Sequence, residues 1–73
     1  MHSGRYDINK LDTIMKMLIN EEVLPISNYD HPLKGRLSEY RECHVEPDWL
    51  LMYQIMNTDI IFVRTGSHSE LFK

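Results

Sequence analysis

The stretch WLLMYQIM, residues 49–56, decides the fold because it is apolar at almost every position. Apolar residues on both alternating faces of a strand are typical of the centre of a sheet, where both faces are covered. Pro47 just before this stretch, and Asn57 and Thr58 just after it, are typical of tight turns. The sequence therefore predicts a central, buried strand that enters and leaves through short turns.

Two shorter strands flank the central one along the chain. One is predicted from about Ser38–Val45 and the other over Ile60–Val63, where β-branched and aromatic residues follow one another. Pro47 argues against a helix that would place His44 and Asp48 one turn apart, and favours a hairpin turn instead. Short turns join strands that run antiparallel, so the three strands are expected to form a meander.

The N-terminal part of the chain has the apolar spacing of a helix. Apolar side chains recur every three or four residues, as on one buried helical face. The stripe consists of Ile8, Leu11, Met15 and Leu18 and is widened by Ile14, Met17 and Ile19. Asp7 is a suitable N-cap for this helix. Residues 1–7 are expected to form a loose leader.

Turn-forming residues separate this helix from the strands, and a second helix is expected at the C-terminus. Residues 20–33 are rich in proline, asparagine, aspartate and serine and predict an irregular loop. Gly66 is expected to break the last strand. Ser67, with Glu70 three residues later, predicts a capping box for a short helix that ends at Leu71–Phe72.

The composition fits one small domain of the α+β class. The 73 residues suffice for an N-terminal helix packed on an antiparallel meander of about three strands, followed by a short C-terminal helix, in a single domain 1–73. Cys43 is the only cysteine, which excludes an internal disulfide. A lone thiol and the lack of an apolar stretch of roughly 18 residues predict a cytoplasmic protein with no membrane partner.

Charge and ligand spacing disfavour two further classes of protein. The formal net charge of −3 argues against a strongly basic RNA-binding surface, although a local basic patch remains compatible with it. A tetrahedral zinc site would need histidines and acids at short motif spacings, which the chain lacks. Cys43 and His44 point to opposite sides of a strand. We therefore predict no metal and no other cofactor.

Three histidines lie at the ends of predicted elements, namely His31, His44 and His68. Consecutive antiparallel pairing brings the turn that carries Asp48 to the same edge of the sheet as the end of the last strand, so Asp48 and His68 are expected to be neighbours. Two histidines beside a carboxylate could supply the acid and the base that cleavage of a phosphodiester requires. Arg64 could hold the phosphate through two N–H donors.

Each candidate residue has a structural alternative. His31 could be a solvated surface residue, and His44 could simply stabilise its turn. Tyr40, Trp49 and Phe72 could stack on bases of single-stranded RNA. For Trp49, core packing is the stronger interpretation because it starts the most apolar strand. Phe72 could equally close a small hydrophobic cluster.

Several short motifs stand in a characteristic order and spacing from about Asn9 to the C-terminus. They are Asp30-His31-Pro32-Leu33 followed by Gly35, then Tyr40-Arg41, then His44-Val45-Glu46-Pro47-Asp48-Trp49, and finally Arg64-Thr65-Gly66 with His68, Leu71 and Phe72. In these motifs the chain resembles the RelE superfamily of bacterial toxins, and most closely its YafQ branch. The resemblance implies a RelE-like fold and a toxin of a type II toxin-antitoxin system. Such a toxin is a ribosome-dependent endoribonuclease that cuts messenger RNA and is silenced by a cognate antitoxin.

The resemblance also implies a set of roles for the site. A ribose 2′-hydroxyl attacks the adjacent phosphate and leaves a cyclic phosphate and a free 5′-hydroxyl, without a metal. His68 would transfer a proton to the leaving oxygen, while His44 and Asp48 would deprotonate or orient the attacking hydroxyl. Arg64 would stabilise the charged phosphorane, His31 would assist, and Phe72 would position a base. Apart from the resemblance, we expect RNA contacts by Lys34, Arg41 and Trp49. Lys34, Arg36, Arg41 and Arg64 are expected to form a local basic patch.

The chain departs from the family at its N-terminus. The family normally begins with a β-strand and a fuller first helix, whereas this chain starts near the end of that helix. An uncovered sheet edge would invite pairing with another chain, so a homodimer or dependence on a partner is expected. The alternative function is a catalytically impaired, truncated toxin that acts as an antitoxin-binding or self-associating module. A displacement of catalytic groups by about 1 Å would suffice, since it costs roughly a hundredfold in rate.

Overall fold

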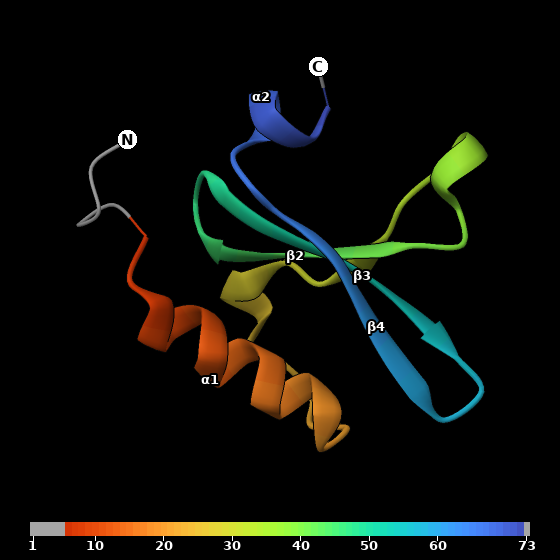
Figure 1. Cartoon of the computed structure of the whole chain (residues 1–73), viewed down its shortest axis with the longest axis horizontal. Helices are drawn as coiled ribbons and strands as arrows, with labels where there is room; N and C mark the ends of the chain where they lie inside the picture. Colours follow the sequence, from red (N-terminus) through yellow and green to blue (C-terminus); the bar gives the residue numbers. More distant parts are fainter. Residues whose placement is uncertain (1–5, 73) are drawn as a thin grey trace.

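The fold is an antiparallel sheet with one longer helix and one short helix (Figure 1). It comes from a computed structural model that describes residues 6–72. The elements, with η for a short 3-10 helix, are α1 (Ile8–Ile19), η2 (Ile26–Asn28), β1 (His31–Pro32), η3 (Gly35–Leu37), β2 (Arg41–Glu46), β3 (Trp49–Met56), β4 (Asp59–Gly66) and α2 (His68–Leu71). The predicted α+β class is confirmed, with a helix before the antiparallel meander and a short helix after it.

The strands follow one another across the sheet in the order β1-β2-β3-β4, and each is antiparallel to the next. The sheet has one strand more than predicted, because β1 lies in the segment that was expected to be a loop and pairs His31 with Glu42. Two residues are too few to show a hydrophobic period, so the sequence carries no sign of this strand. β2 begins at Arg41 and not at Ser38, because Ser38 caps η3.

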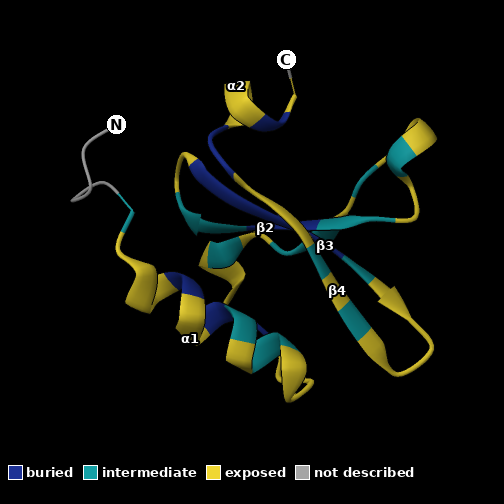
Figure 2. Cartoon of the chain, viewed as in Figure 1, coloured by how far each residue is buried: buried dark blue, intermediate teal, exposed yellow. Residues whose placement is uncertain are grey.

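The central strand β3 is buried over its first five residues, as predicted. Leu51 and Tyr53 face α1 on one side of the sheet. The core on this side is completed by Leu11, Ile14, Leu24, Cys43 and Trp49. Leu50 and Met52 alternate to the other side and are also buried. The last two residues of β3 are exposed, at the outer end of the β3–β4 hairpin (Figure 2).

Helix α1 begins where the sequence predicts it. The Asp7 carboxylate accepts a hydrogen bond from the backbone N–H two residues on, at 3.0 Å, which confirms the N-cap. Leu11 and Ile14 are buried against the sheet. The expected apolar stripe is too long at both ends, because Ile8 and Ile19 are 66% and 56% exposed. Only the middle of α1 lies against the sheet, so the stripe continues beyond the contact.

Helix α2 is held by the predicted capping box. The N–H of Glu70 donates to Ser67 Oγ at 3.3 Å, and the N–H of Ser67 donates to Glu70 Oε1 at 2.7 Å. Gly66 is the last residue of β4, so the strand ends at this glycine as predicted. A Cβ at Gly66 would lie 2.7 Å from Glu70 Oε1, so the capping carboxylate requires a glycine here. Phe72 follows the helix as its C-cap.

The expected loose leader is wrong for Tyr6, while residues 1–5 lie outside the described part of the chain. The Tyr6 ring stacks on Trp49 with centroids 4.7 Å apart and planes at 29°. Its hydroxyl donates to Glu70 Oε1 at 3.2 Å, so this residue connects the start of α1 with α2. Neither helix of the described residues has the length and apolar character needed to cross a bilayer.

Candidate active site

The end of β2 and the β2–β3 turn bring His44 and Asp48 to the end of the sheet where α2 begins. A register shift between His44 and Glu46 marks a β-bulge, which re-aims side chains next to a turn. His44 Nδ1 lies 3.2 Å from the carbonyl oxygen of Pro47. Because a carbonyl only accepts, this contact places the proton on Nδ1 and leaves Nε2 as the acceptor of the neutral ring.

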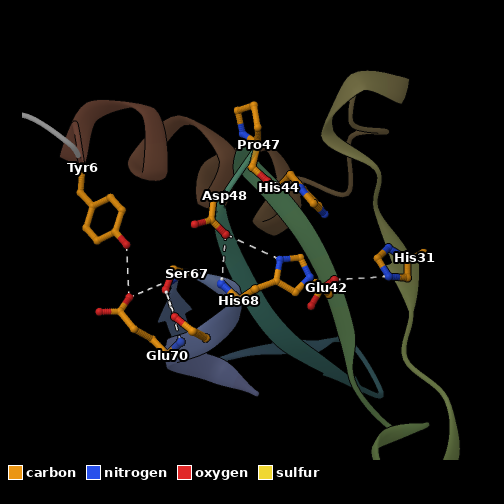
Figure 3. Close-up of polar contacts among 10 residues, drawn as sticks. Tyr6, His31, Glu42, His44, Pro47, Asp48, Ser67, His68 and Glu70 are labelled. Atoms are coloured by element: carbon orange, nitrogen blue, oxygen red, sulfur yellow. Dashed lines mark hydrogen bonds and ion pairs between the residues drawn. The ribbon is translucent and has the colours of Figure 1, made fainter. Parts of the chain in front are cut away.

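Asp48 meets His68 as the topology predicts. Its Oδ1 accepts the backbone N–H of His68 at 3.2 Å and lies 3.7 Å from His68 Nδ1 (Figure 3). Both side chains are more than half exposed, so the pair is open to a ligand. The carboxylate of Asp48 therefore faces both the backbone N–H and the ring of His68.

Aromatic rings connect the members of this cluster. The ring centroids of His44 and His68 are 6.1 Å apart, and those of His68 and Phe72 are 6.0 Å apart. Phe72 is 38% exposed, so its ring is accessible beside the two histidines. Three elements, the β2–β3 turn, α2 and its C-cap, thus bring acid-base groups and an exposed aromatic ring together.

His31 joins the cluster from β1 through a residue that the sequence analysis did not include. Its ring stacks on Tyr29 at 4.2 Å, and Tyr29 in turn lies 5.6 Å from the His44 ring. His31 Nδ1 is 2.7 Å from the Tyr29 carbonyl oxygen, and Nε2 is 3.4 Å from Glu42 Oε1. Glu42 was missed as well, although it lies two residues before His44 and therefore on the same face of β2.

Arg64 lies on this face of the sheet. The register pairs it with Met52 on β3, and Met52 is paired in turn with Glu42 on β2. Arg64 Nη2 donates to the carbonyl oxygen of Glu70 at 3.4 Å, which holds the side chain next to α2. An exposed guanidinium beside the histidine cluster can bind a phosphate through two parallel hydrogen bonds.

Arg41, which was expected to contact RNA, lies on the opposite face of the sheet from the histidine cluster. Its Nε donates to Asp30 Oδ1 at 3.4 Å and to the Tyr53 hydroxyl at 3.2 Å. Burial opposes the charge of the Arg41 guanidinium, but the hydrogen bond to Tyr53 and the charge of Asp30 outweigh it and raise its pKa. Burial and the hydrogen bond to Asp30 also raise the pKa of Tyr53. This network ties the segment before His31 to the core side of the sheet.

Trp49 and Lys34 also lie apart from the cluster. The Trp49 indole is 2% exposed and donates from Nε1 to Thr65 Oγ1 at 2.8 Å, so it is closed to an RNA base and forms part of the core instead. Lys34 precedes η3, which lies to the right of α2 and apart from it in Figure 1. Of the four basic residues expected to form a patch, Arg64 is the one beside the histidines.

A hollow of about 600 Å³ opens beside the β2–β3 turn. Its lining residues are Lys10, Ser27, Asn28, His44, Val45, Glu46 and Pro47. Asn28 Nδ2 donates to the His44 carbonyl oxygen at 2.7 Å, and Lys10 Nζ lies 2.8 Å from Glu46 Oε2. The hydrogen bond and charge of Glu46 raise the pKa of Lys10. These contacts join η2 and α1 to the end of β2, so the hollow has fixed walls.

The cluster consists of side chains that can donate and accept protons. Within residues 6–72, no three histidine, cysteine, aspartate or glutamate side chains come close enough to hold a metal ion. The one cysteine, Cys43, is fully buried, and burial raises its pKa to about 12. Its thiol is therefore protonated and is not a nucleophile at neutral pH.

Comparison with known proteins identifies close relatives of this chain. It is 48% identical over 67 residues to the mRNA interferase toxin YafQ of Escherichia coli strain K12, covering 90% of this chain and 73% of that protein. The crystal structure of YafQ from E. coli strain BL21(DE3) superposes with a TM-score of 0.88 at 43% identity, covering 94% of this chain and 78% of that one. YafQ in the E. coli DinJ-YafQ toxin-antitoxin complex superposes with a TM-score of 0.85 at 46% identity, covering 94% and 77%.

The family comparison agrees with these relatives. The family described as the bacterial toxin of type II toxin-antitoxin system, YafQ, matches residues 1–73. The resemblance inferred from the sequence motifs is confirmed, and so is the RelE-like fold, although this chain is shorter than its relatives. The chain belongs to the YafQ family of bacterial toxins of type II toxin-antitoxin systems.

Proposed function

We propose that this chain is an endoribonuclease that cleaves messenger RNA on translating ribosomes in the cytoplasm. The E. coli relatives that share nearly half of its residues carry the name mRNA interferase toxin. The observation that carries the proposal is the contact of Asp48 with both the backbone N–H and the imidazole of His68, next to His44. A carboxylate and two imidazoles at one exposed sheet end supply the groups that phosphodiester cleavage needs.

The protonation geometry supports distinct roles for the two histidines. His44 keeps its proton on Nδ1, so its Nε2 can accept the proton of a ribose 2′-hydroxyl. Asp48 holds His68 by its backbone N–H and lies 3.7 Å from Nδ1 of its ring, and a protonated His68 would give its proton to the leaving 5′-oxygen. Asp48 therefore acts through His68 in this scheme and does not take the hydroxyl proton itself. The nucleophile comes from the RNA, and the products are a 2′,3′-cyclic phosphate and a free 5′-hydroxyl.

Arg64, Phe72 and the hollow beside His44 would hold the RNA. A guanidinium gains more from the charged pentacoordinate phosphorane than from the ground-state phosphate, so Arg64 would lower the barrier. The exposed ring of Phe72 offers a stacking surface for a base, which contributes about 1–3 kcal/mol in single-stranded nucleic acid complexes. The hollow beside His44 leaves space for a neighbouring nucleotide.

A cognate antitoxin is the second part of the proposal. YafQ of E. coli is found in a complex with DinJ, and the present chain covers 77% of the toxin in that complex with a TM-score of 0.85. We expect an antitoxin of the same kind to bind this chain and to suppress its cleavage of messenger RNA.

Cleavage of a reporter messenger RNA on translating ribosomes tests the proposed activity. Wild-type protein should cut the message, and His68→Ala should slow cutting by about 10²–10⁴-fold, the usual contribution of a positioned proton donor. Lys16→Ala is the matched control, because Lys16 is an exposed residue of α1 that pairs only with Asp12 among the described residues. Equal cutting by wild type and His68→Ala would overturn the role given to His68.

The exposed edge of β4 favours a second candidate function, a module that self-associates or binds the antitoxin without cleaving RNA. Among the described residues β4 pairs with β3 alone, and Ile61 and Val63 on it are 43% and 40% exposed. An eight-residue edge strand with apolar side chains is a template for pairing with another chain. Size-exclusion chromatography with light scattering should show a dimer that Ile61→Lys dissociates. A wild-type monomer at all concentrations would contradict self-association.

A further inference from the structure

His31 differs from the other two site histidines because both of its ring nitrogens face protein oxygens. Nδ1 lies 2.7 Å from the carbonyl oxygen of Tyr29, and this oxygen can only accept, so Nδ1 carries a proton. Nε2 lies 3.4 Å from Glu42 Oε1 (Figure 3). The side chain of His31 is 26% exposed, and its ring is further fixed by stacking on Tyr29. The ring therefore has little freedom to turn a nitrogen toward a substrate.

Glu42 is a buried carboxyl group with too few partners of its own. Its side chain is 5% exposed, and its Oε2 accepts no hydrogen bond from any described residue. The β1–β2 register places it directly opposite His31, so the contact is built into the sheet. A buried charge is costly unless an opposite charge faces it, and a second proton on His31 Nε2 supplies that charge.

The other charged groups near His31 lie away from its Nε2, so Glu42 is the acid that would favour a proton on this nitrogen. Asp30 belongs to the other face, where Arg41 and Tyr53 bind it. On the near face, His44 follows two residues along β2, and Arg64 on β4 is separated from Glu42 by Met52. The Tyr29 ring covers His31 from the loop side. Within residues 6–72, Glu42 is the acid within ion-pair distance of His31.

We propose that Glu42 is a positioning residue that keeps His31 doubly protonated, so that His31 presents a fixed positive charge to the RNA and does not transfer a proton. This inference rests on the proposed function for the identity of the substrate, but the state of the ring can be tested without RNA. Proton transfer is then left to His44 and to His68, whose side chain is more than half exposed. The charge of His31 would attract a phosphate of the bound strand.

Nitrogen-15 NMR of the histidine rings in the RNA-free chain tests the proposal directly. At about pH 7.5 an ordinary histidine is mostly neutral, whereas His31 should show protons on both Nδ1 and Nε2. In Glu42→Gln the same ring should become neutral, with its proton on Nδ1 only. Glu39→Gln is the matched control, because Glu39 is exposed and contacts Gln54 instead. A neutral His31 ring in the wild-type chain at this pH would overturn the proposal, and so would a ring unchanged in Glu42→Gln.

Cleavage by substituted proteins gives an independent measurement. His31→Lys keeps a positive charge but cannot act as a proton shuttle at neutral pH, so it should cut messenger RNA at least about tenfold faster than His31→Asn. His44→Lys should show no such recovery relative to His44→Asn, because a lysine cannot accept the hydroxyl proton. Equal loss in His31→Lys and His31→Asn would contradict a charge role. If no protein cleaves RNA, the proposed function fails, while the NMR result still decides the protonation of His31.

Discussion

Replacement of Tyr53 by phenylalanine tests how the segment that carries His31 is held. The Tyr53 ring is 1% exposed in the core. Its hydroxyl donates to Asp30 Oδ1 at 2.5 Å and accepts from Arg41 Nε at 3.2 Å. Asp30 directly precedes His31, so this single hydroxyl ties the His31 segment to the central strand. Tyr53→Phe removes the hydroxyl and leaves the ring in place.

The expected loss of stability follows from these two hydrogen bonds. A hydrogen bond to a charged group contributes about 1.5–3 kcal/mol net. Arg41 and Asp30 stay in contact at 3.4 Å, and their side chains are 34% and 26% exposed, so water and their own attraction offset part of the loss. We expect the free energy of unfolding to fall by about 2 kcal/mol. For a domain of this size that lowers Tm by roughly 8–16 °C.

Urea unfolding followed by the fluorescence of Trp49, the one tryptophan of the chain, measures this change. Tyr40→Phe is the matched control, because the Tyr40 hydroxyl makes no hydrogen bond to another described residue. A Tyr53→Phe protein within about 0.5 kcal/mol of the control, the spread of ordinary surface substitutions, would refute the reasoning. The cleavage rate should fall together with stability, since His31 loses its anchor.

The same hydroxyl makes stability depend on alkaline pH. Burial, together with the hydrogen bond to Asp30, raises the pKa of Tyr53 above that of an unfolded tyrosine, which is about 10. The neutral phenol therefore contributes its full stabilisation below about pH 10, and this contribution disappears as pH rises toward the pKa of the folded state. Stability measured between about pH 8 and 11 should decline more steeply in wild type than in Tyr53→Phe. Parallel curves would contradict the assignment.

Three further predictions concern the site and its support. Asp48→Asn should slow messenger RNA cleavage by about tenfold or more, because His68 loses the carboxylate that holds its backbone N–H and faces its ring. An unchanged rate would exclude this role. Burial raises the pKa of Cys43 to about 12, so its thiol should react with iodoacetamide only as fast as the chain unfolds locally. Urea should therefore accelerate the reaction. Rapid labelling of the folded chain would contradict this expectation, because it would show that the thiol is accessible. Gly66→Ala should lower stability by about 1–2 kcal/mol, as loss of a helix cap does, because its Cβ would lie 2.7 Å from Glu70 Oε1; a thermal melt equal to wild type would contradict the close approach.

Local features of the chain were predictable because each depends on residues near one another in sequence. The bounds of the central strand, the Asp7 cap and the capping box of Ser67 with Glu70 are all found where the sequence places them. The proximity of Asp48 and His68 was also predictable. In an antiparallel meander the start of β3 lies beside the end of β4, and these two residues stand next to those strand ends.

The composition of the site was less predictable, because it depends on which face each strand residue takes. Arg41 and Glu42 are adjacent polar residues, and Arg41 was the one expected at the site. The register gives the opposite result, with Arg41 bound to Asp30 and Tyr53 and Glu42 beside His31. The sequence shows that side chains alternate between the two faces of a strand. It does not show which face α1 covers, and so it does not show which residues share the open face with the histidines.

The sequence by itself determined the order of the elements, the two hairpin turns, the helix caps and the motifs that place this chain in its toxin family. These features are set by backbone preferences and by hydrogen bonds between near neighbours, so each has a local signature. Three features were decided by the tertiary structure alone. The Tyr6 ring stacks on Trp49, β1 pairs with β2, and the buried carboxylate of Glu42 lies beside the His31 ring. Those contacts join distant parts of the chain, and they arise from sheet register and packing, which leave no local pattern to detect.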